Sequence, residues 1–370
     1  MQVVNTSVIS NKKVLLRYDI DVALRTEGAQ GKLIVGEEFK LKAGLETLKL
    51  CLENAVKVVM IGHVGRPFKT AEDEEKSPVD SSSTRDPRKD LSAQPIFEWF
   101  KQNGFPEIEF AKTLEEAKNS VAKFVLLENT RFFHGEVPGA EYHATCTSKT
   151  CDVDFAHQLA SLGEVYVNEA FSSHNSAAST TIVPTLIPHF AGLHFAEEVQ
   201  VLGGVRDNPK KPFIAIMGGA KVDTKLPVIN VLAKKADAIL VGGKLIAEIR
   251  EQKPELPANV MVGKLNQDGF DISEDTTSAW GDLISKAAMI VWNGPMGKFE
   301  VPKYNQTEKI IDAILNCPGE IIIGGGDSVA ALSQYNLLEK AGQKGFVSVG
   351  GGAMLKFLSD GTLPTIEALR

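Results

Sequence analysis

The chain has 370 residues, of which 43% are hydrophobic and 24% are charged, and its formal net charge is −7. This length predicts two domains, and the acidic balance argues against a nucleic-acid partner. No apolar run approaches the ~18 residues that span a membrane, and the N-terminus lacks a secretory signal, so we expect no membrane partner. Four cysteines in so long a chain do not make a disulfide framework, and a reducing cytoplasm is the expected compartment.

One pattern recurs along the chain: a short apolar run ends in glycine or a polar residue, and a helical stretch follows. Continuous apolar strands that alternate with helices are typical of parallel sheets covered on both faces. We therefore predict an α/β fold of two doubly wound, Rossmann-like parallel-sheet domains. The predicted strands are Val14–Leu16, Val58–Ile61, Phe124–Leu127, Val165–Val167, Phe213–Met217, Ala238–Val241, Met289–Trp292, Glu320–Ile323 and Phe346–Val349.

The junction between the two domains is predicted between Pro184 and Gly204. Two prolines precede a helical pattern over Ala196–Leu202, and Gly203 and Gly204 are expected to stop that helix. The predicted divisions are residues 1–186, a hinge helix within 187–204, and residues 205–356.

Ligands of such sheets bind at the carboxyl ends of the strands. The first half offers cationic side chains there, which suit a small anionic substrate: Arg17, His63, Arg66 and Arg131. The second half offers glycines and lysines, which suit the phosphates of a nucleotide. The two halves are therefore expected to bind different anions.

Four glycine loops follow strands of the second half. In Gly324–Ser328, consecutive glycines let backbone N–H groups approach an anion, the following helix adds its dipole, and Asp327 could hold Mg²⁺. The alternative is a tight turn without a ligand. The same strand–glycine–helix arrangement recurs at Gly350–Gly352, Gly218–Lys221 and Gly242–Lys244. Tight packing alone is therefore a weaker explanation of these glycines than anion binding.

Lys221 and Lys225 lie four residues apart at the start of a predicted helix. This spacing places both ammonium groups on one helix face, where an anion between them would relieve their conflict with the helix dipole. The alternative is an ordinary solvated helix face.

Two polar insertions stand apart from the pattern. Lys69–Lys89 is predicted to be a mobile loop. Around Gly135–Asp154, the side chains of His134, His143, Cys146, Cys151 and His157 could ligate zinc, but their spacing matches no standard site, and an ordinary surface insertion is the alternative. The chain contains no P-loop motif, no dinucleotide-binding fingerprint after its first strand, and no Ser–His–Asp signature.

Several of these segments resemble the phosphoglycerate kinase family, in order and along the whole chain. The most specific is Trp292-Asn293-Gly294-Pro295-Met296-Gly297, which continues to Glu300. The others are Arg17–Asp21, His63–Pro67, Leu127–Phe132, Val167–Phe171, Gly218–Val222, Gly324–Asp327 and Leu363–Leu369.

The resemblance implies a role for each candidate residue. The first domain would bind 3-phosphoglycerate through Asp19, His63, Arg66 and Arg131, with Arg17 and Asp21 beside them. The second would bind ATP or ADP with Mg²⁺, the metal held by Asp327, the phosphates by Lys221 and Lys225, the ribose by Glu300, and the phosphate chain lying beside Asn293. Further nucleotide contacts are expected at Gly219, Gly243, Pro295, Gly326 and Ser328, and catalytic contacts at Lys40, Lys221, Gly351 and Gly352. The tail 357–370 would return to the first domain, the domains would close about the hinge helix, and we expect a monomer.

The chain departs from the family at several site positions. Lys40, Asp21 and Asn175 stand where the family has Arg, Asn and Arg, and Glu169, Lys244 and Val349 replace Asp, Gly and Thr. The first prediction is reversible phosphoryl transfer between ATP and the carboxylate of 3-phosphoglycerate, as in glycolysis and gluconeogenesis. The alternatives are a catalytically impaired nucleotide-binding paralogue with a binding or regulatory role, and a related kinase with a changed acid substrate.

Overall fold

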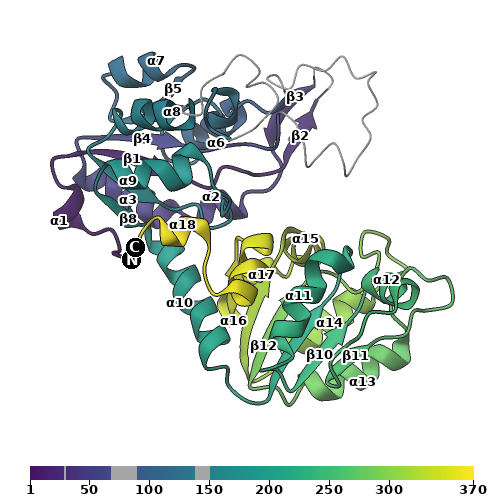
Figure 1. Cartoon of the computed structure of the whole chain (residues 1–370). Helices are drawn as coiled ribbons and strands as arrows, with labels where there is room; N and C mark the ends of the chain where they lie inside the picture. The colour runs from purple at the N-terminus through teal and green to yellow at the C-terminus, as the bar shows by residue number, and fades with distance from the viewer. Residues whose placement is uncertain (29–30, 68–89, 138–150) are drawn as a thin grey trace. The chain divides into compact units, whose positions relative to one another are not determined.

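The computed structural model describes residues 1–28, 31–67, 90–137 and 151–370 (Figure 1). The chain divides into two compact units: unit 1 is Met1–Glu197 with Pro364–Arg370, and unit 2 is Glu198–Leu363. Each unit contains a six-stranded sheet in which every pairing is parallel. The prediction of two parallel α/β domains is therefore confirmed.

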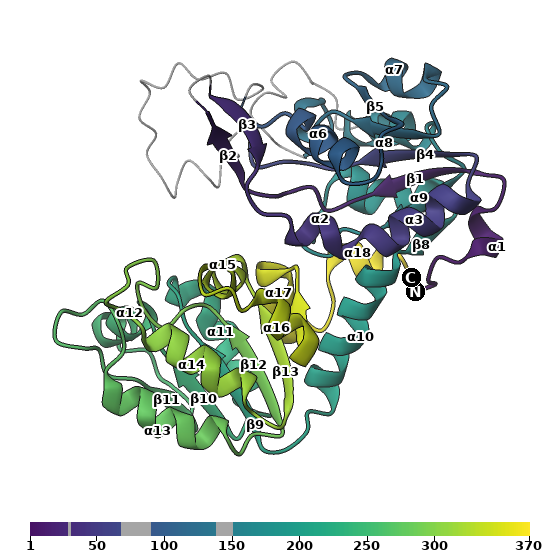
Figure 2. The same cartoon turned by 180° about the vertical axis from the view of Figure 1, so that it is seen from behind.

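Unit 1 has the strand order β5-β6-β4-β1-β7-β8. Its central strands are buried on both faces because α3 and α6 cover one face and α8 and α9 the other (Figures 1 and 2). The strands are β1 (Lys13–Arg17), β4 (Lys57–Ile61), β5 (Ile108–Ala111), β6 (Phe124–Leu127), β7 (Val165–Asn168) and β8 (His189–Ala191), with a separate hairpin of β2 (Leu24–Glu27) and β3 (Lys32–Val35). The helices are α1 (Thr6–Ile9), α2 (Phe39–Ala43), α3 (Leu45–Asn54), α6 (Gln94–Gln102), α7 (Leu114–Asn119), η1 (Thr130–Phe132), α8 (Cys151–Ala160), η3 (Ala178–Ile182), α9 (Val183–Leu186) and α18 (Pro364–Glu367).

Unit 2 has the strand order β11-β10-β9-β12-β13-β14. Helices α11 and α17 cover one face of this sheet, and α14 and α16 cover the other (Figures 1 and 2). The strands are β9 (Phe213–Met217), β10 (Ala238–Val241), β11 (Val260–Val262), β12 (Met289–Asn293), β13 (Glu320–Gly324) and β14 (Phe346–Ser348). The helices are α11 (Val222–Leu232), α12 (Leu245–Gln252), α13 (Glu274–Ile284), α14 (Gln306–Leu315), α15 (Gly326–Gln334), α16 (Leu338–Lys344) and α17 (Gly351–Asp360).

The long helix α10 (Leu193–Asp207) contains the point at which the chain passes from unit 1 to unit 2. The predicted stop at Gly203-Gly204 is wrong, because the helix continues through both glycines. A helical glycine costs about 1 kcal/mol relative to alanine. The burial of Leu202 and Val205 on either side of the pair offsets this cost.

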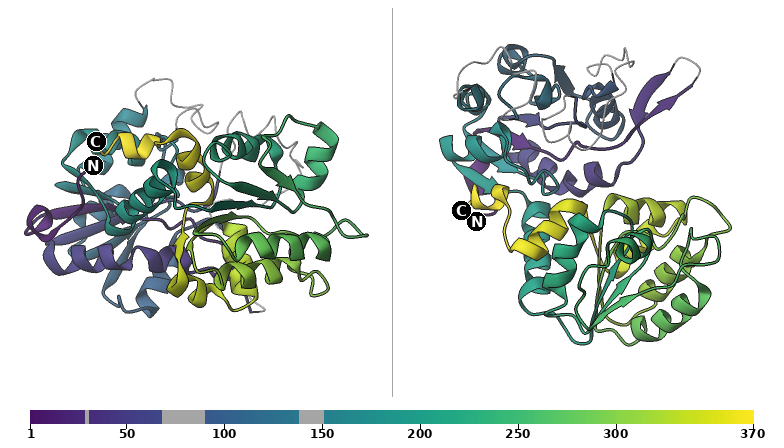
Figure 3. Two further views of the ribbon diagram at one scale, coloured as in Figure 1. Left: turned by 90° about the horizontal axis from the view of Figure 1, so that it is seen from below. Right: turned by 45° about the vertical axis from the view of Figure 1, so that its right-hand side comes forward.

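The C-terminal segment Pro364–Arg370 belongs to unit 1. Thr365, Ile366 and Leu369 are buried there, and the two chain termini lie close together in every view (Figure 3). Within the described ranges, none of the helices is long and apolar enough to cross a bilayer. The insertion Lys69–Lys89, together with His143 and Cys146 of the possible zinc cluster, lies outside the described residues.

Candidate active site

The carboxyl ends of the unit 1 strands bring the predicted substrate residues together. Arg17 ends β1 and is in register with Ile61 of β4 and Asn168 of β7. The loops after these strands carry the other candidates, so His63 lies against Arg17, with 2.6 Å between Nη2 and Nδ1. Asp21 lies on the other side of the same imidazole, with 3.6 Å between its Oδ2 and Nε2.

These contacts fix the form of His63. A guanidinium has only donors, so the Nδ1 atom that Arg17 contacts must accept, and the neutral ring carries its proton on Nε2, toward Asp21. Burial lowers the pKa of His63 to about 4, and the charges of Arg131 and Arg17 act in the same direction, although Asp21 opposes them. His63 is therefore a neutral hydrogen-bonding group at neutral pH.

Asp21, where the family has Asn, is well satisfied. Its Oδ1 accepts the N–H of Gly65 at 2.8 Å. Burial alone would raise the pKa of Asp21, but the hydrogen bond to His63, the charge of Lys40 and the Gly65 N–H together hold it below its usual range. Asp21 is therefore a carboxylate at neutral pH.

Lys40 contacts residues from two strand ends. Its Nζ donates to the Asp21 carbonyl at 2.9 Å and to Ser172 Oγ at 3.2 Å, and lies 3.8 Å from Asp19 Oδ1. Ser172 in turn donates to Asp19 Oδ2 at 2.5 Å. The sequence analysis missed Ser172, which orders the predicted cation and the predicted carboxylate together.

Arg17 is held by a chain of hydrogen bonds to residues that were not predicted from the sequence. Its Nε donates to Ser179 Oγ at 3.2 Å, and Ser179 donates to the buried Glu136 at 2.6 Å. The hydroxyl of Thr130 donates to the same carboxylate at 3.0 Å. Glu136 thus supplies a negative charge close to Arg17, a residue that is only 1% exposed.

The two remaining arginine candidates lie at the same edge of the sheet. Arg131 donates from Nη1 to the carbonyl of Gly65 at 2.5 Å, and Arg66, the next residue after that glycine, is exposed. Asn175 is also exposed, and its carbonyl accepts the hydroxyl of Thr180. The side chain of Asn175 cannot replace the charge of the family's arginine.

Glu169 directly follows β7 and caps α10. Its Oε1 accepts the N–H of His194 at 3.0 Å and the hydroxyl of Thr47 at 3.0 Å, and its Oε2 accepts the N–H of Phe195 at 3.2 Å. Complete burial nevertheless raises the pKa of Glu169 to about 7. The residue that replaces the family's Asp therefore belongs to the start of the connecting helix rather than to the cluster of cations.

The glycine loops of unit 2 converge because the strand ends lie in one row. Val241, Met217, Asn293, Gly324 and Ser348 pair in succession across the sheet. A glycine loop begins within two residues of every strand end in this row. The predicted loops therefore lie at one edge of one sheet.

The loops also touch one another. A Cβ built on Gly351 would lie 2.6 Å from the Cα of Gly325, and one on Gly243 would lie 2.8 Å from the N of Gly219. The Gly219 N–H donates to the Pro295 carbonyl at 2.9 Å. At these contacts only glycine allows the backbones to approach so closely.

Lys225 is buried beneath the loops. Its Nζ donates to the carbonyl of Gly218 and to Asn293 Oδ1 at 2.8 Å. The Asn293 amide N–H donates to the Gly324 carbonyl at 2.8 Å, and the Gly294 N–H donates to Ser328 Oγ at 2.7 Å. Burial lowers the pKa of Lys225 to about 8, although the charge of Asp327 opposes this change.

Lys221 is placed differently from Lys225. It is exposed, and it precedes the first residue of α11 in a left-handed conformation, with φ 73° and ψ 76°. The helical spacing used in the sequence analysis therefore does not apply to this pair. The N–H groups of Lys221 and Val222 donate to Glu248, a residue that the sequence did not indicate.

The other nucleotide candidates surround the loops. Gly326 and Asp327 open α15 and are exposed, as are Glu300 in the loop after β12 and Gly352 in the first turn of α17. Asp327 offers the hard oxygen that Mg²⁺ prefers, and its charge acts on the buried Lys225. Among the described residues, no group of three or more His, Cys, Asp or Glu side chains could hold a metal by itself. One carboxylate together with phosphate oxygens is a usual arrangement for Mg²⁺.

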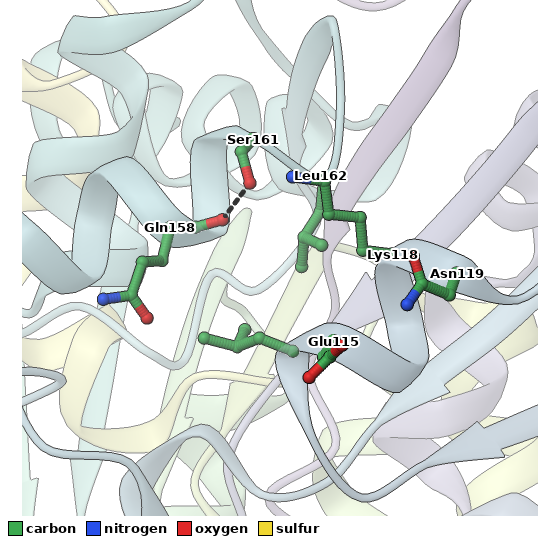
Figure 4. A pocket seen from close by; sticks show the side chains of 7 residues that line it. Glu115, Lys118, Asn119, Gln158, Ser161 and Leu162 are labelled. Atoms are coloured by element: carbon green, nitrogen blue, oxygen red, sulfur yellow. Dashed lines mark hydrogen bonds between the residues drawn. The ribbon is translucent and has the colours of Figure 1, made fainter.

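A surface pocket lies between α7 and α8 (Figure 4). It is lined by Leu114, Glu115, Lys118, Asn119, Gln158, Ser161 and Leu162. Asn119 precedes β6 and Leu162 precedes β7, so the pocket is at the amino ends of the strands. It therefore lies at the opposite edge of the sheet from the candidate site.

Comparison with known proteins decides the family. The family model described as "Phosphoglycerate kinase" matches residues 4–254 and 248–361. The chain belongs to the phosphoglycerate kinase family. A phosphoglycerate kinase of Desulfovibrio desulfuricans is 31% identical, with 98% of this chain and 96% of that protein covered, and one of Moorella thermoacetica is 32% identical, with 98% and 97% covered.

Solved phosphoglycerate kinase structures share the fold. The structure from Pyrococcus horikoshii superposes with a TM-score of 0.78 at 22% identity and covers 100% of this chain and 98% of its own. The one from Coxiella burnetii has a TM-score of 0.72 at 24% identity, with 98% and 96% covered. Both units of this chain therefore have counterparts in phosphoglycerate kinases.

Proposed function

We propose that this chain is a phosphotransferase that reversibly moves the γ-phosphoryl group of ATP to the carboxylate of 3-phosphoglycerate. The observation that carries the proposal is the family match, which runs through both units and so includes both halves of the machinery. In the forward direction the bond from the β,γ-bridging oxygen to Pγ breaks, a carboxylate oxygen of the acid bonds to Pγ, and ADP leaves. No protein nucleophile is required.

Unit 1 is proposed to hold the acid. Arg17, His63, Arg66 and Arg131 gather at one sheet edge, and neutral His63 links Arg17 to Asp21 without adding charge. Lys40 brings a cation to the same edge, ordered by Asp19 and Ser172. Cations that are already oriented neutralise an anionic substrate without further reorganisation. We assign this role to residues 1–186 with the returning tail.

Unit 2 is proposed to hold ATP or ADP on the glycine loops of residues 205–356. Lys221 is exposed and available to a phosphate, and Lys225 supports the loop carbonyls from below. Asp327 would hold Mg²⁺ together with phosphate oxygens, and the metal would neutralise the charge of the phosphate chain. Glu300 is proposed to contact the ribose, and Gly351 and Gly352 the transferring group.

A coupled assay tests the proposal. Purified protein is given ATP, Mg²⁺ and 3-phosphoglycerate, and ADP formation that depends on the acid is expected. Its absence at high enzyme concentration would contradict the proposal. Calorimetry then identifies the alternative: ADP binding without 3-phosphoglycerate binding would indicate a nucleotide-binding protein without kinase activity. Size-exclusion chromatography tests the expected monomer.

A further inference from the structure

The backbone of Lys221 adopts a conformation that lysine rarely adopts. A left-handed residue other than glycine costs roughly 1–2 kcal/mol, so neighbouring contacts must maintain it. Lys221 is also the N-cap of α11, and no side chain of its own segment caps that helix. Whatever holds this turn also sets the direction in which the Lys221 side chain leaves the loop.

Glu248 makes the contacts that hold the turn. From the first turn of α12, its Oε1 accepts the Lys221 N–H at 3.2 Å and its Oε2 accepts the Val222 N–H at 2.7 Å. One carboxylate thus satisfies two donors that α11 leaves without intrahelical partners. Its negative charge also lies at the positive end of the α11 dipole.

A second connection joins α12 to the same loop. The N–H of Leu245 donates to the Gly219 carbonyl at 3.1 Å, and Gly243 packs directly against Gly219. The glycine loop before α11 is therefore tied to α12 by two hydrogen bonds to Glu248 and one from Leu245. Of these three, only the Glu248 bonds depend on a side chain and can be removed by substitution.

We propose that Glu248 is a positioning residue for the phosphate-binding Lys221. The carboxylate accepts the N–H of Lys221, which belongs to the loop predicted to bind an anion, and the N–H of Val222. The phosphate is therefore bound by the Lys221 ammonium and not by these two amides. Glu248 does not touch the substrate in this assignment. It acts by keeping the Lys221 turn in its left-handed form, and the inference rests on the proposed role of Lys221.

A double-mutant cycle tests the inference. Turnover and the KM for ATP are measured for Glu248→Ala, Lys221→Ala and the double variant, with Glu251→Ala, exposed on the same helix, as the control. Lys221→Ala is expected to lower kcat by about 100-fold or more, and Glu248→Ala by about 10-fold. In the Lys221→Ala background, the Glu248 substitution should change kcat less than ~2-fold, because coupled residues are not additive.

The outcomes are distinguishable. Additive effects, or a Glu248→Ala variant with unchanged kcat, overturn the inference and leave the role of Lys221 intact. An unchanged kcat in Lys221→Ala overturns the proposed phosphate contact, and this inference with it. Thermal unfolding checks each variant, and Glu248→Gln, which keeps one acceptor oxygen, replaces the alanine variant in the cycle if that variant does not fold. Partial recovery of kcat in Glu248→Gln relative to Glu248→Ala supports the inference.

Discussion

Glu169 makes the stability of this protein depend on pH in a direction opposite to that of most carboxylates. Burial raises its pKa to about 7, whereas an unfolded chain has the ordinary value of 4.5. Between these values the folded protein keeps a proton that the unfolded chain has lost. Stability therefore falls as pH rises through this window, by about 1.4 kcal/mol per pH unit, or roughly 3 kcal/mol in total.

The perturbation is Glu169→Gln, which keeps the shape of the α10 cap and cannot ionise. Urea unfolding followed by circular dichroism, at several values between pH 4.5 and pH 8, gives the free energy of unfolding of each protein. The difference, wild type minus variant, should decrease by about 3 kcal/mol over this range. Glu46→Gln, an exposed residue next to Thr47 on α3, is the matched control and should give a constant difference.

The result that would refute this reasoning is a difference that stays level or increases with pH. An increase would mean that the two backbone N–H groups, the Thr47 hydroxyl and the α10 dipole stabilise the Glu169 carboxylate by more than burial destabilises it. The measurement therefore weighs desolvation directly against helix capping at one buried carboxyl group.

Three further outcomes are expected. Lys40→Arg should not lower kcat, because a guanidinium keeps the charge and adds donors; a fall beyond ~10-fold would show that the pocket is built around lysine. The imidazole of His63 should titrate in NMR with a pKa of about 4, and a midpoint near 6.5 would contradict the contacts described. Gly351→Ala should lower the free energy of unfolding by ~1–3 kcal/mol, because its Cβ would meet Gly325. Urea unfolding measures this change, and the control Gly342→Ala, on a helix with open space around it, should be neutral or stabilising.

The central strands of both sheets could be predicted from the sequence because a buried parallel strand is a continuous apolar run. All nine predicted runs form strands, at or within a few residues of the expected positions. The strands that were missed are β5, β8, β11 and the β2–β3 hairpin. All of them lie at sheet edges or outside the main sheets, and β11 has no fully buried residue. Without two covered faces, a strand loses the continuous apolar run by which it was recognised.

The candidate site could also be predicted in part from the sequence, for a related reason. A polar residue just after a buried apolar run can be recognised from its position in the sequence. Arg17, His63 and Asn293 were predicted in this way. Glu136 and Glu248 were missed because each acts on a partner distant in sequence and shows no local pattern; Glu248 reaches back 27 residues to Lys221. Only coordinates reveal such a supporting residue.

The placement of Pro364–Arg370 in unit 1 has a consequence for synthesis. Unit 2 is a continuous stretch of chain, and unit 1 is built from the segments on either side of it. A ribosome therefore finishes all of unit 2 before unit 1 receives Ile366 and Leu369, which are buried in it. A nascent chain halted just before Pro364 would carry a completed second unit beside a first unit that still lacks part of its interior.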